Sequence, residues 1–321
     1  MGDEAHMERG SLCIVVPCHN EEQSLPVLFE RMAEVERMLG EWVEGPVRYV
    51  MVDDGSIDAT LDILRDLHRH RPEVHYLSFS RNFGKEAGLA AGLRKARDLD
   101  ADFVAVMDAD LQDPPALLPQ MFARIAEGCD VAAAYRVSRA GEPPVRSWFA
   151  NRFYDIINRI SDVEMKSGAR DFRLMTKRVV NAILSLPENS RFSKGIFSWV
   201  GFETAWIPYE NVEREHGSSN WSFFSLMRYA LDGIVAFSTV PLELISISGL
   251  FVCMAAALFL IFVLVRALAF GDPVAGWPSL MCVILLLGGA ILFGLGIVGL
   301  YLSKVYAEVK RRPLYVVEEE A

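Results

Sequence analysis

The stretch VAVMDADLQDPP, residues 104–115, decides the fold of this chain. Its valine-rich start is typical of a buried strand, and Asp108 and Asp110 follow one residue apart. Side chains alternate along an extended chain, so both carboxylates are expected on the same side. Pro114 and Pro115 cannot continue a central strand and are expected to open the next helix. The stretch therefore predicts two carboxylates at the carboxyl end of a strand, where open α/β sheets bind their ligands.

The aspartate pair has two interpretations when it is taken alone. Carboxylate oxygens suit Mg²⁺ or Mn²⁺, and such a cation would bridge to a substrate diphosphate. An acidic turn exposed to solvent has the same pattern, and a bare Asp-x-Asp is common. The neighbouring segments decide between the two.

Apolar segments of strand length alternate with segments of helical periodicity through the first part of the chain. The expected strands lie at residues 12–16, 47–52, 74–79, 104–108 and 130–134, and a helix is expected after each of the first four. This alternation predicts an α/β fold, Rossmann-like, with a mostly parallel sheet and helices on both faces.

Three polar loops follow successive strands, at residues 17–21, 53–56 and 108–110. Such loops meet at one edge of a parallel sheet. No glycine-rich Walker or dinucleotide fingerprint accompanies them, which disfavours hydride transfer and nucleotide hydrolysis. Lys85 and Arg136 are candidates to offset phosphate charge. The three polar loops with these two cations suit transfer of a sugar from a nucleoside diphosphate. A metal held by the aspartates would stabilise the departing diphosphate.

Composition excludes other classes of function. The 321 residues carry a formal net charge of -10 and no basic stripe, which argues against nucleic acid as a partner. The five cysteines show no zinc spacing and indicate reduced thiols of a cytosol-facing protein. The polar residues before Ser11 do not resemble a signal peptide.

Two long apolar segments, 244–265 and 277–302, contain no charged residue. Each exceeds the roughly 20 residues needed to cross a bilayer, and the short link at 271–276 predicts a hairpin. Positive charge favours the cytosol, and Lys304 and residues 310–312 follow the second segment. The sheet domain and both termini are therefore expected on the cytosolic side. Small residues at positions 290 and 294 suit close packing, either within the hairpin or in a homo-oligomer.

Amphipathic segments precede the hairpin. Residues 221–237 place serines, Arg228 and Asp232 on one stripe and large apolar residues elsewhere, which predicts a helix lying at the bilayer surface. Residues 146–160 fit either packing on the domain or a bilayer surface. The expected parts are a cytosolic domain at 1–220, an interfacial helix at 221–240, two membrane helices within 241–303 (about 243–267 and 277–303), and a cytosolic tail at 304–321.

Several motifs in a fixed order resemble those of family 2 glycosyltransferases of the GT-A fold. Within that family the chain is similar to polyprenyl-phosphate glycosyltransferases, both dolichyl-phosphate mannose synthases and, more closely, bacterial bactoprenol glucosyltransferases. The matching stretches are VPCHNE (16–21), VDDGS (52–56), SRNFGKE (80–86), DADLQDPP (108–115), GARDFRL (168–174), KGIFSWVG (194–201), ALDGI (230–234) and YAEVKRRP (306–313).

The resemblance implies roles for individual residues. A nucleotide sugar would contact Pro17, His19, Glu21, Val52, Asp54, Lys85, Asp108, Ala109, Asp110 and Arg136. Mg²⁺ or Mn²⁺ would be held by Asp108, Asp110 and Gln112, and the lipid phosphate by Arg170, Arg214 and Ser219. Asp171 matches the carboxylate that the family uses in catalysis. Asn220 stands where relatives commonly have lysine, so one expected phosphate contact is in doubt.

The implied activity is inverting transfer of a sugar to a polyprenyl phosphate such as undecaprenyl phosphate, at the cytosolic face of a bacterial inner membrane. UDP-glucose is the first choice of donor, with GDP-mannose or another nucleotide sugar as alternatives, and a β-linked product is expected. Asp171 would act either as a base or as a positioning group. A processive polysaccharide synthase is disfavoured because no Gln-x-x-Arg-Trp motif occurs. A membrane-anchored, non-catalytic sugar-nucleotide scaffold is the remaining alternative.

Overall fold

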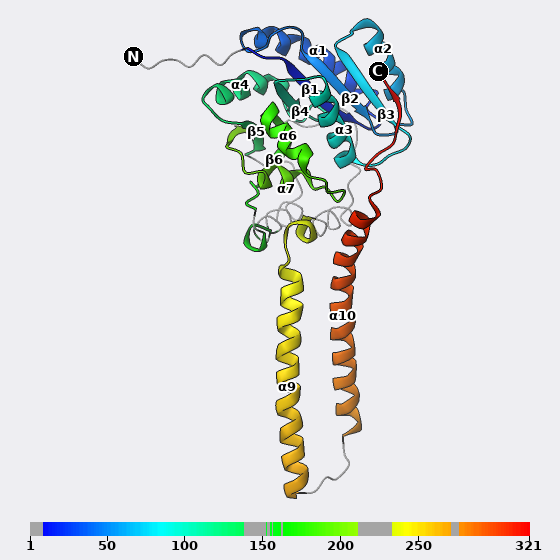
Figure 1. The fold of residues 1–321 in the computed structure, drawn as a ribbon, viewed down its shortest axis with the longest axis vertical. Helices are drawn as coiled ribbons and strands as arrows, with labels where there is room; N and C mark the ends of the chain where they lie inside the picture. The colour runs from blue at the N-terminus through cyan, green and yellow to red at the C-terminus, as the bar shows by residue number, and fades with distance from the viewer. Residues whose placement is uncertain are drawn as a thin grey trace, which may run out of the picture.

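The computed structural model describes residues 9–137, 163–210, 233–270 and 276–321, together with residues 152, 155 and 157–161. Within these ranges a sheet domain lies at one end of two long helices (Figure 1). Arg214, Ser219, Asn220 and most of the expected interfacial helix lie outside the described residues.

The domain is built on one eight-stranded sheet, in the order β7-β5-β6-β4-β1-β2-β3-β8. The strands are β1 (Leu12–Cys18), β2 (Arg48–Asp53), β3 (Val74–Phe79), β4 (Phe103–Val106), β5 (Val131–Arg136), β6 (Ala169–Thr176), β7 (Thr204–Tyr209) and β8 (Val317–Glu320). Strands β1 to β4 pair in parallel, as do β5 and β7, while β6 and β8 run antiparallel to their neighbours. The prediction of a mostly parallel sheet is confirmed.

Helices cover both faces of this sheet, as predicted. They are α1 (Ser24–Met38), α2 (Thr60–His70), α3 (Lys85–Asp98), α4 (Leu118–Ala126), α6 (Lys177–Ser185) and α7 (Ser193–Trp199). Side chains of α1, α2 and α4 share one buried cluster with one face of the strands, and those of α3, α6 and α7 share a second cluster on the other face.

The antiparallel strand β6 brings a distant segment to the ligand edge of the sheet. Arg173 lies opposite Val106, the last residue of β4, and Thr176 lies opposite Phe103, the first. The first residues of β6, including Asp171, therefore lie just beyond the end of β4. The first residues of the antiparallel strand β6 therefore lie at the same edge of the sheet as the carboxyl ends of the parallel strands β1 and β4.

The expectation that strand alternation orients Asp108 and Asp110 is wrong. Strand β4 ends at Val106, and residues 109–110 form a turn that Leu111 continues with φ 55°. The turn, rather than a pleated strand, brings the two aspartates near each other. Pro115 begins a short 3₁₀ helix, Pro115–Leu117, that leads into α4, as expected.

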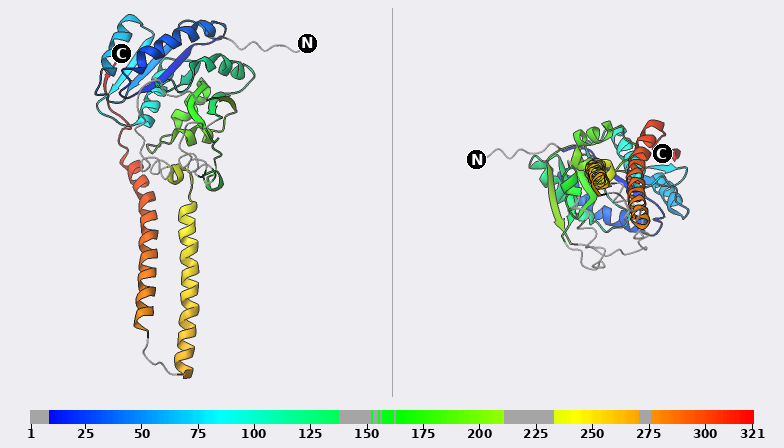
Figure 2. Two further views of the ribbon diagram at one scale, coloured as in Figure 1. Left: turned by 180° about the vertical axis from the view of Figure 1, so that it is seen from behind. Right: turned by 90° about the horizontal axis from the view of Figure 1, so that it is seen from below.

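Two long helices, α9 (Val240–Phe270) and α10 (Trp277–Lys310), run side by side away from the sheet domain (Figures 1 and 2). Their segments Val240–Phe259 and Val283–Lys310 are long and apolar enough to cross a membrane. In each helix, no residue of the most apolar part is buried. This indicates membrane association. A Cβ added at Gly294 would lie 3.3 Å from Ile245 Cγ2, so this small residue packs within the helix pair.

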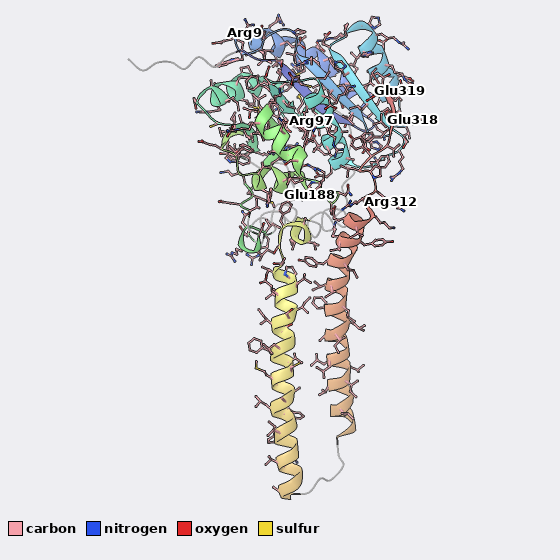
Figure 3. The ribbon with its side chains drawn as sticks, viewed as in Figure 1. Arg9, Arg97, Glu188, Arg312, Glu318 and Glu319 are labelled. Atoms are coloured by element: carbon pink, nitrogen blue, oxygen red, sulfur yellow. The ribbon has the colours of Figure 1, made fainter. Side chains whose placement is uncertain are left out.

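The segment expected as a tail instead returns to the sheet. Helix α10 continues to Lys310, and β8 then pairs with β3 and forms the edge of the sheet, with Glu319 opposite Ser78. Figure 3 shows Glu318 and Glu319 at the edge of the domain, with Arg312 at the domain end of α10. The polypeptide after the long helices is therefore part of the sheet domain.

Candidate active site

The loops after β1 and β2 are tied to each other by hydrogen bonds. His19 Nδ1 lies 3.0 Å from the carbonyl oxygen of Asp54, and the backbone N–H of Asn20 donates to Ser56 Oγ at 2.9 Å. The backbone N–H of Glu21 donates to Thr60 Oγ1, and Pro17 and Val52 are register partners at the ends of β1 and β2. The residues predicted to contact the nucleotide from these strands therefore form one continuous rim.

Asp54 connects this rim to the start of α3. Its two carboxylate oxygens accept hydrogen bonds from the backbone N–H groups of Phe83, at 2.6 Å, and Gly84, at 2.9 Å. Burial raises the pKa of Asp54, and these two hydrogen bonds oppose the shift. Gly55 has φ 63°, and a Cβ there would lie 2.4 Å from the backbone carbon of Arg81. The loop after β2 is thus fixed against the segment that carries Lys85.

Lys85 joins two carboxylates from different strands. Its Nζ lies 2.6 Å from Oδ1 and 2.9 Å from Oδ2 of Asp108, and 2.5 Å from Oδ2 of Asp171. One ammonium group therefore holds together the end of β4, the start of β6 and the first turn of α3. The pKa of Lys85 is raised: burial alone would lower it, but the charges of the two aspartates dominate.

The two carboxylates around Lys85 have opposite pKa shifts. Burial raises the pKa of Asp108, and the charge of Lys85 opposes this shift. The negative charges of Asp171, Asp113 and Asp110 raise the pKa further. Burial would also raise the pKa of Asp171, but Lys85 and Lys194 hold it well below its usual range. Asp171 is therefore firmly ionised, whereas the Asp108 side of the site carries an excess of negative charge.

That excess is what a divalent cation would relieve. Across the described ranges no group of three His, Cys, Asp or Glu side chains forms a protein-only metal cage. Mg²⁺ is commonly held by one or two carboxylates together with substrate phosphates. Asp108 and Asp110, which have one residue between them, fit that mode of binding, in which the substrate would supply the remaining oxygen ligands.

Arg170 lies on the opposite face of β6 from Asp171. Its Nε donates to Asp113 Oδ1 at 2.9 Å, and its Nη2 donates to the amide oxygen of Gln112 at 3.1 Å. Tyr209 also donates to Asp113, whose side chain is fully buried. This cluster fixes the loop after Asp110, and a phosphate-binding role for Arg170 stays a prediction.

Arg136, at the end of β5, reaches the same edge through the backbone. Its N–H donates to the carbonyl oxygen of Gly168 at 3.0 Å. Gly168 has φ 78°, and a Cβ there would lie 2.6 Å from the carbonyl oxygen of Arg136. Glycine is therefore needed where the chain enters β6, three residues before Asp171.

Two functional candidates were missing from the sequence-based set. Arg173, 3% exposed, donates to the carbonyl oxygens of Asp171 at 3.2 Å and Arg170 at 2.8 Å, and burial lowers its pKa to about 10. Glu86 accepts two hydrogen bonds from the backbone N–H of Ser193, at 3.1 and 3.0 Å, and one from its hydroxyl. Both residues lie inside motif stretches quoted above, and only tertiary packing distinguishes them from their neighbours.

Comparisons with known proteins show which family the chain belongs to. Residues 13–184 match the family model described as "Glycosyl transferase family 2". The "Putative glycosyltransferase CsbB" of Bacillus subtilis (strain 168) is 39% identical over 313 residues, which is 98% of this chain and 93% of that protein. The "SfII prophage-derived bactoprenol glucosyl transferase" of Shigella flexneri is 40% identical over 308 residues, 96% of this chain and 97% of that protein.

Among solved structures, the mannosyltransferase PcManGT from Pyrobaculum calidifontis, in complex with GDP-Man and Mn²⁺, is similar with a TM-score of 0.42 and 17% identity, over 96% of this chain and 86% of that chain. The family model spans the rim, both aspartates of the turn, Asp171 and Arg173.

Proposed function

The chain belongs to glycosyl transferase family 2 and is a glycosyltransferase, and from that premise we propose that it transfers a sugar from a nucleoside diphosphate sugar to a polyprenyl phosphate. The proposed donor is UDP-glucose and the proposed acceptor is undecaprenyl phosphate. The near full-length similarity to proteins named bactoprenol glucosyl transferase supports both choices.

The observation that carries the proposal is the Lys85 bridge between Asp108 and Asp171. It brings a cation and an ionised carboxylate to the edge where the rim at Pro17, Val52 and Asp54 would bind the nucleotide. A Mg²⁺ or Mn²⁺ ion at Asp108 and Asp110, with Gln112 beside them, would stabilise the charge of the leaving diphosphate.

The acceptor needs little activation. A phosphate monoester has a second pKa near ~6, so its oxygen is already negative at neutral pH. The lowered pKa of Asp171 makes this carboxylate a weak base. We therefore assign Asp171 to positioning: it holds Lys85 and would orient the sugar, and the reaction would invert an α-linked donor to a β-linked lipid product.

The proposed location is the cytosolic face of a bacterial inner membrane. The domain ends of the two long helices meet, since the hydroxyl of Tyr301 donates to the carbonyl oxygen of Ser238 at 2.6 Å. Glu308, near the end of α10, accepts hydrogen bonds from the backbone N–H groups of Asn189 and Ser190. Both helices therefore leave the domain on the same side, from which they would enter the bilayer. The positive charge at residues 310–312 favours a cytosolic position for the domain.

The test is radiolabelled sugar transfer by the purified full chain in nanodiscs that contain undecaprenyl phosphate. UDP-glucose, GDP-mannose and UDP-N-acetylglucosamine are compared, each with Mg²⁺, Mn²⁺ or chelator, and the label in the extracted lipid is counted. We expect a metal-dependent glucolipid that a β-glucosidase cleaves. If only GDP-mannose labels the lipid, the donor is GDP-mannose and not UDP-glucose. Nucleotide binding without any lipid product would favour a non-catalytic sugar-nucleotide scaffold.

A further inference from the structure

We propose that Glu86 and Glu308 are positioning residues that couple the attachment of helix α10 to the placement of Lys85. Each carboxylate holds one end of the short segment 189–193, which leads into α7. The coupling concerns the transfer of a sugar, whichever donor and lipid acceptor take part, so it goes beyond the proposed function.

Glu308 holds the first end of this segment. It lies on α10, two residues before the last residue of that helix, Lys310. Its carboxylate accepts hydrogen bonds from the backbone N–H of Asn189, at 2.9 and 3.0 Å to its two oxygens, and from that of Ser190 at 2.7 Å. Hydrogen bonds to an ionised acceptor are roughly twice as strong as neutral ones. The domain end of α10 is therefore attached to the backbone of the segment.

Glu86 holds the other end and follows Lys85 in the first turn of α3. Its two oxygens accept hydrogen bonds from the backbone N–H of Ser193, at 3.1 and 3.0 Å, and one of them also from the Ser193 hydroxyl. Burial raises the pKa of Glu86, and the hydrogen bonds from Ser193 oppose this shift. Because Ser193 is the first residue of α7 and is buried, the contact fixes the start of α7 against the start of α3.

The segment between the two glutamates is short and packed. Only Arg191 and Phe192 separate Ser190 from Ser193, whose Cα atoms are therefore at most about 11 Å apart. The side chain of Phe192 is buried, and its ring centroid lies 6.0 Å from that of Phe237. The guanidinium of Arg191 donates to two backbone carbonyl oxygens at the end of α6, at 3.3 and 3.4 Å. A displacement of the segment at its α10 end would therefore be passed on to α7.

Lys85 lies between two anchors of the first turn of α3. On one side Asp54, in the rim, accepts hydrogen bonds from the two backbone N–H groups that precede Lys85. On the other side Glu86 holds the start of α7. The Lys85 ammonium contacts Asp108 at 2.6 Å and Asp171 at 2.5 Å, so a shift of Glu86 would change the contacts of Lys85 with both aspartates.

Helix α7 lies between the sheet and the two long helices (Figure 1). With α10 attached, Glu308, the segment 189–193 and Glu86 keep Lys85 in place. A chain whose α10 is detached would lose this support at α7 and hold Lys85 less well. Efficient cleavage of the nucleotide sugar would then be limited to chains whose long helices are assembled with the domain.

The test is hydrogen-exchange mass spectrometry on the full chain in phosphatidylcholine nanodiscs, without donor or acceptor. The reporters are the amides of Ala87 and Gly88, which donate to the carbonyl oxygen of Gly84 in the first turn of α3. The variants are Glu308→Gln, Glu86→Gln and the double variant. Glutamine keeps the shape of the side chain but places an NH₂ group where a carboxylate oxygen accepted a hydrogen bond.

The matched control is Glu243→Gln. Glu243 lies at the domain end of the other long helix, α9, and accepts a local hydrogen bond from the Thr239 hydroxyl at 2.9 Å. Glu319→Gln tests the other attachment of the chain after α10, through β8. The melting temperature reports on folding. Glu308→Asp, which keeps the charge but shortens the side chain, is the second variant at this position if Glu308→Gln does not fold.

We expect Glu308→Gln to increase exchange at Ala87 and Gly88 about threefold or more, although these amides lie on a different helix. Glu308→Asp should have a smaller effect in the same direction. The double variant should exceed Glu86→Gln by less than about twofold, because both glutamates act on one path and their effects are not additive. Glu243→Gln and Glu319→Gln should leave these two amides near their wild-type rates.

Faster exchange confined to residues 189–197 in Glu308→Gln, with Ala87 and Gly88 unchanged, overturns the proposal, since Glu308 would then be a local clamp. Additive effects of Glu308→Gln and Glu86→Gln also overturn it. An equal effect of Glu319→Gln on the two amides overturns it in favour of a path through β8.

Steady-state kinetics separates positioning from a loss of folding. With the nucleotide sugar that the transfer assay identifies, Glu308→Gln should lower kcat about tenfold and change KM for that sugar less than about twofold, since Lys85 is misplaced while the rim is intact. A higher KM at unchanged kcat would contradict positioning of Lys85.

The exchange measurement does not require sugar transfer, so it separates this proposal from the proposed function. Coupled exchange in a chain that makes no lipid-linked sugar would leave the coupling standing and reject the proposed acceptor. Transfer to undecaprenyl phosphate by a chain without coupled exchange would do the reverse.

Discussion

Arg65 on α2 and Glu319 on β8 form a bidentate ion pair across 254 residues of sequence. Arg65 Nε donates to Glu319 Oε1 at 3.0 Å, and Nη2 lies 2.5 Å from Oε2. Tyr76 donates a further hydrogen bond to the same carboxylate at 2.5 Å. The ion pair fastens the segment that follows the two long helices to α2, and the Tyr76 hydrogen bond ties the same segment to β3.

The first prediction concerns this fastening. Glu319→Gln should increase amide hydrogen exchange in β8 by up to about fivefold, the range expected when a half-exposed ion pair is lost. Glu318→Gln is the control, because Glu318 lies on the opposite, exposed face of β8. Hydrogen-exchange mass spectrometry on the nanodisc-embedded chain measures both. Equal exchange in the two variants would show that the ion pair does not hold β8.

The same pair predicts a dependence on pH. Hydrogen bonds from Arg65 and Tyr76 lower the pKa of Glu319 from 4.5 to about 2. Since the folded pKa is the lower one, the stabilisation is present above about pH 4.5 and is lost as the pH falls toward 2. Protection of β8 should therefore decline over that window in the wild type, and by less in Glu319→Gln. A decline of the same size in both would assign the acid sensitivity to other carboxylates.

Asp171→Asn tests positioning against base catalysis. We expect sugar transfer to fall about 100-fold, as for a misplaced reacting group, while the Kd for the nucleotide sugar changes little. Because the pKa of Asp171 is well below its usual range, the ratio of mutant to wild-type rates should be constant from pH 6.5 to 9. A ratio that follows the titration of one group would indicate a base. Asp98→Asn, on the exposed end of α3, is the control.

Lys85→Met should have opposite effects on metal binding and on transfer. Lys85 covers both carboxylate oxygens of Asp108, so its removal should strengthen Mn²⁺ binding in the absence of donor, measured by electron paramagnetic resonance. Transfer should fall about 100-fold, because a preorganised cation is lost from the site. Mn²⁺ binding that is weakened or unchanged would show that the cation is held elsewhere than at Asp108.

Gly168→Ala should destabilise the domain by about 1–3 kcal/mol, since it adds a Cβ at a positive φ and close to the carbonyl oxygen of Arg136. Gly201→Ala is a matched control: φ is 72° there as well, but the nearest atom to an added Cβ is 3.9 Å away. Chemical denaturation of both variants separates the contact from the backbone strain. A loss at Gly168 no larger than at Gly201 would contradict the close approach.

Local sequence patterns predicted much of the site. Apolar strands followed by polar loops predicted that His19, Asp54 and the Asp108 turn would gather at one edge. The His19–Asp54 contact confirms this for the first two loops, and Lys85, which follows the residues held by Asp54, contacts Asp108. The sequence predicts that Lys85 offsets phosphate charge, and in the structure Lys85 contacts the carboxylates of Asp108 and Asp171. Its role toward a phosphate therefore stays a prediction.

Long-range pairing was not predictable in this way. Asp171 reaches the site because β6 inserts antiparallel between β4 and β5, and no periodicity within the segment determines its partners. The charged sequence of β8 resembles a solvated tail, and its antiparallel partner β3 lies more than 200 residues earlier. Arg173 belongs to a motif, but only its burial beneath α7 distinguishes it from a surface arginine.

The position of β8 in the chain also governs the order of biosynthesis. Because β8 follows α9 and α10, the ribosome produces it only after both apolar helices. Until then the backbone of β3 is an open edge, and such edges pair readily with other strands. Because α9 and α10 run side by side in opposite directions, the chain that follows α10 returns to the sheet domain, where β8 covers this edge. Chains in which α9 and α10 fail to pair would keep β3 uncovered and open to pairing with strands of other chains.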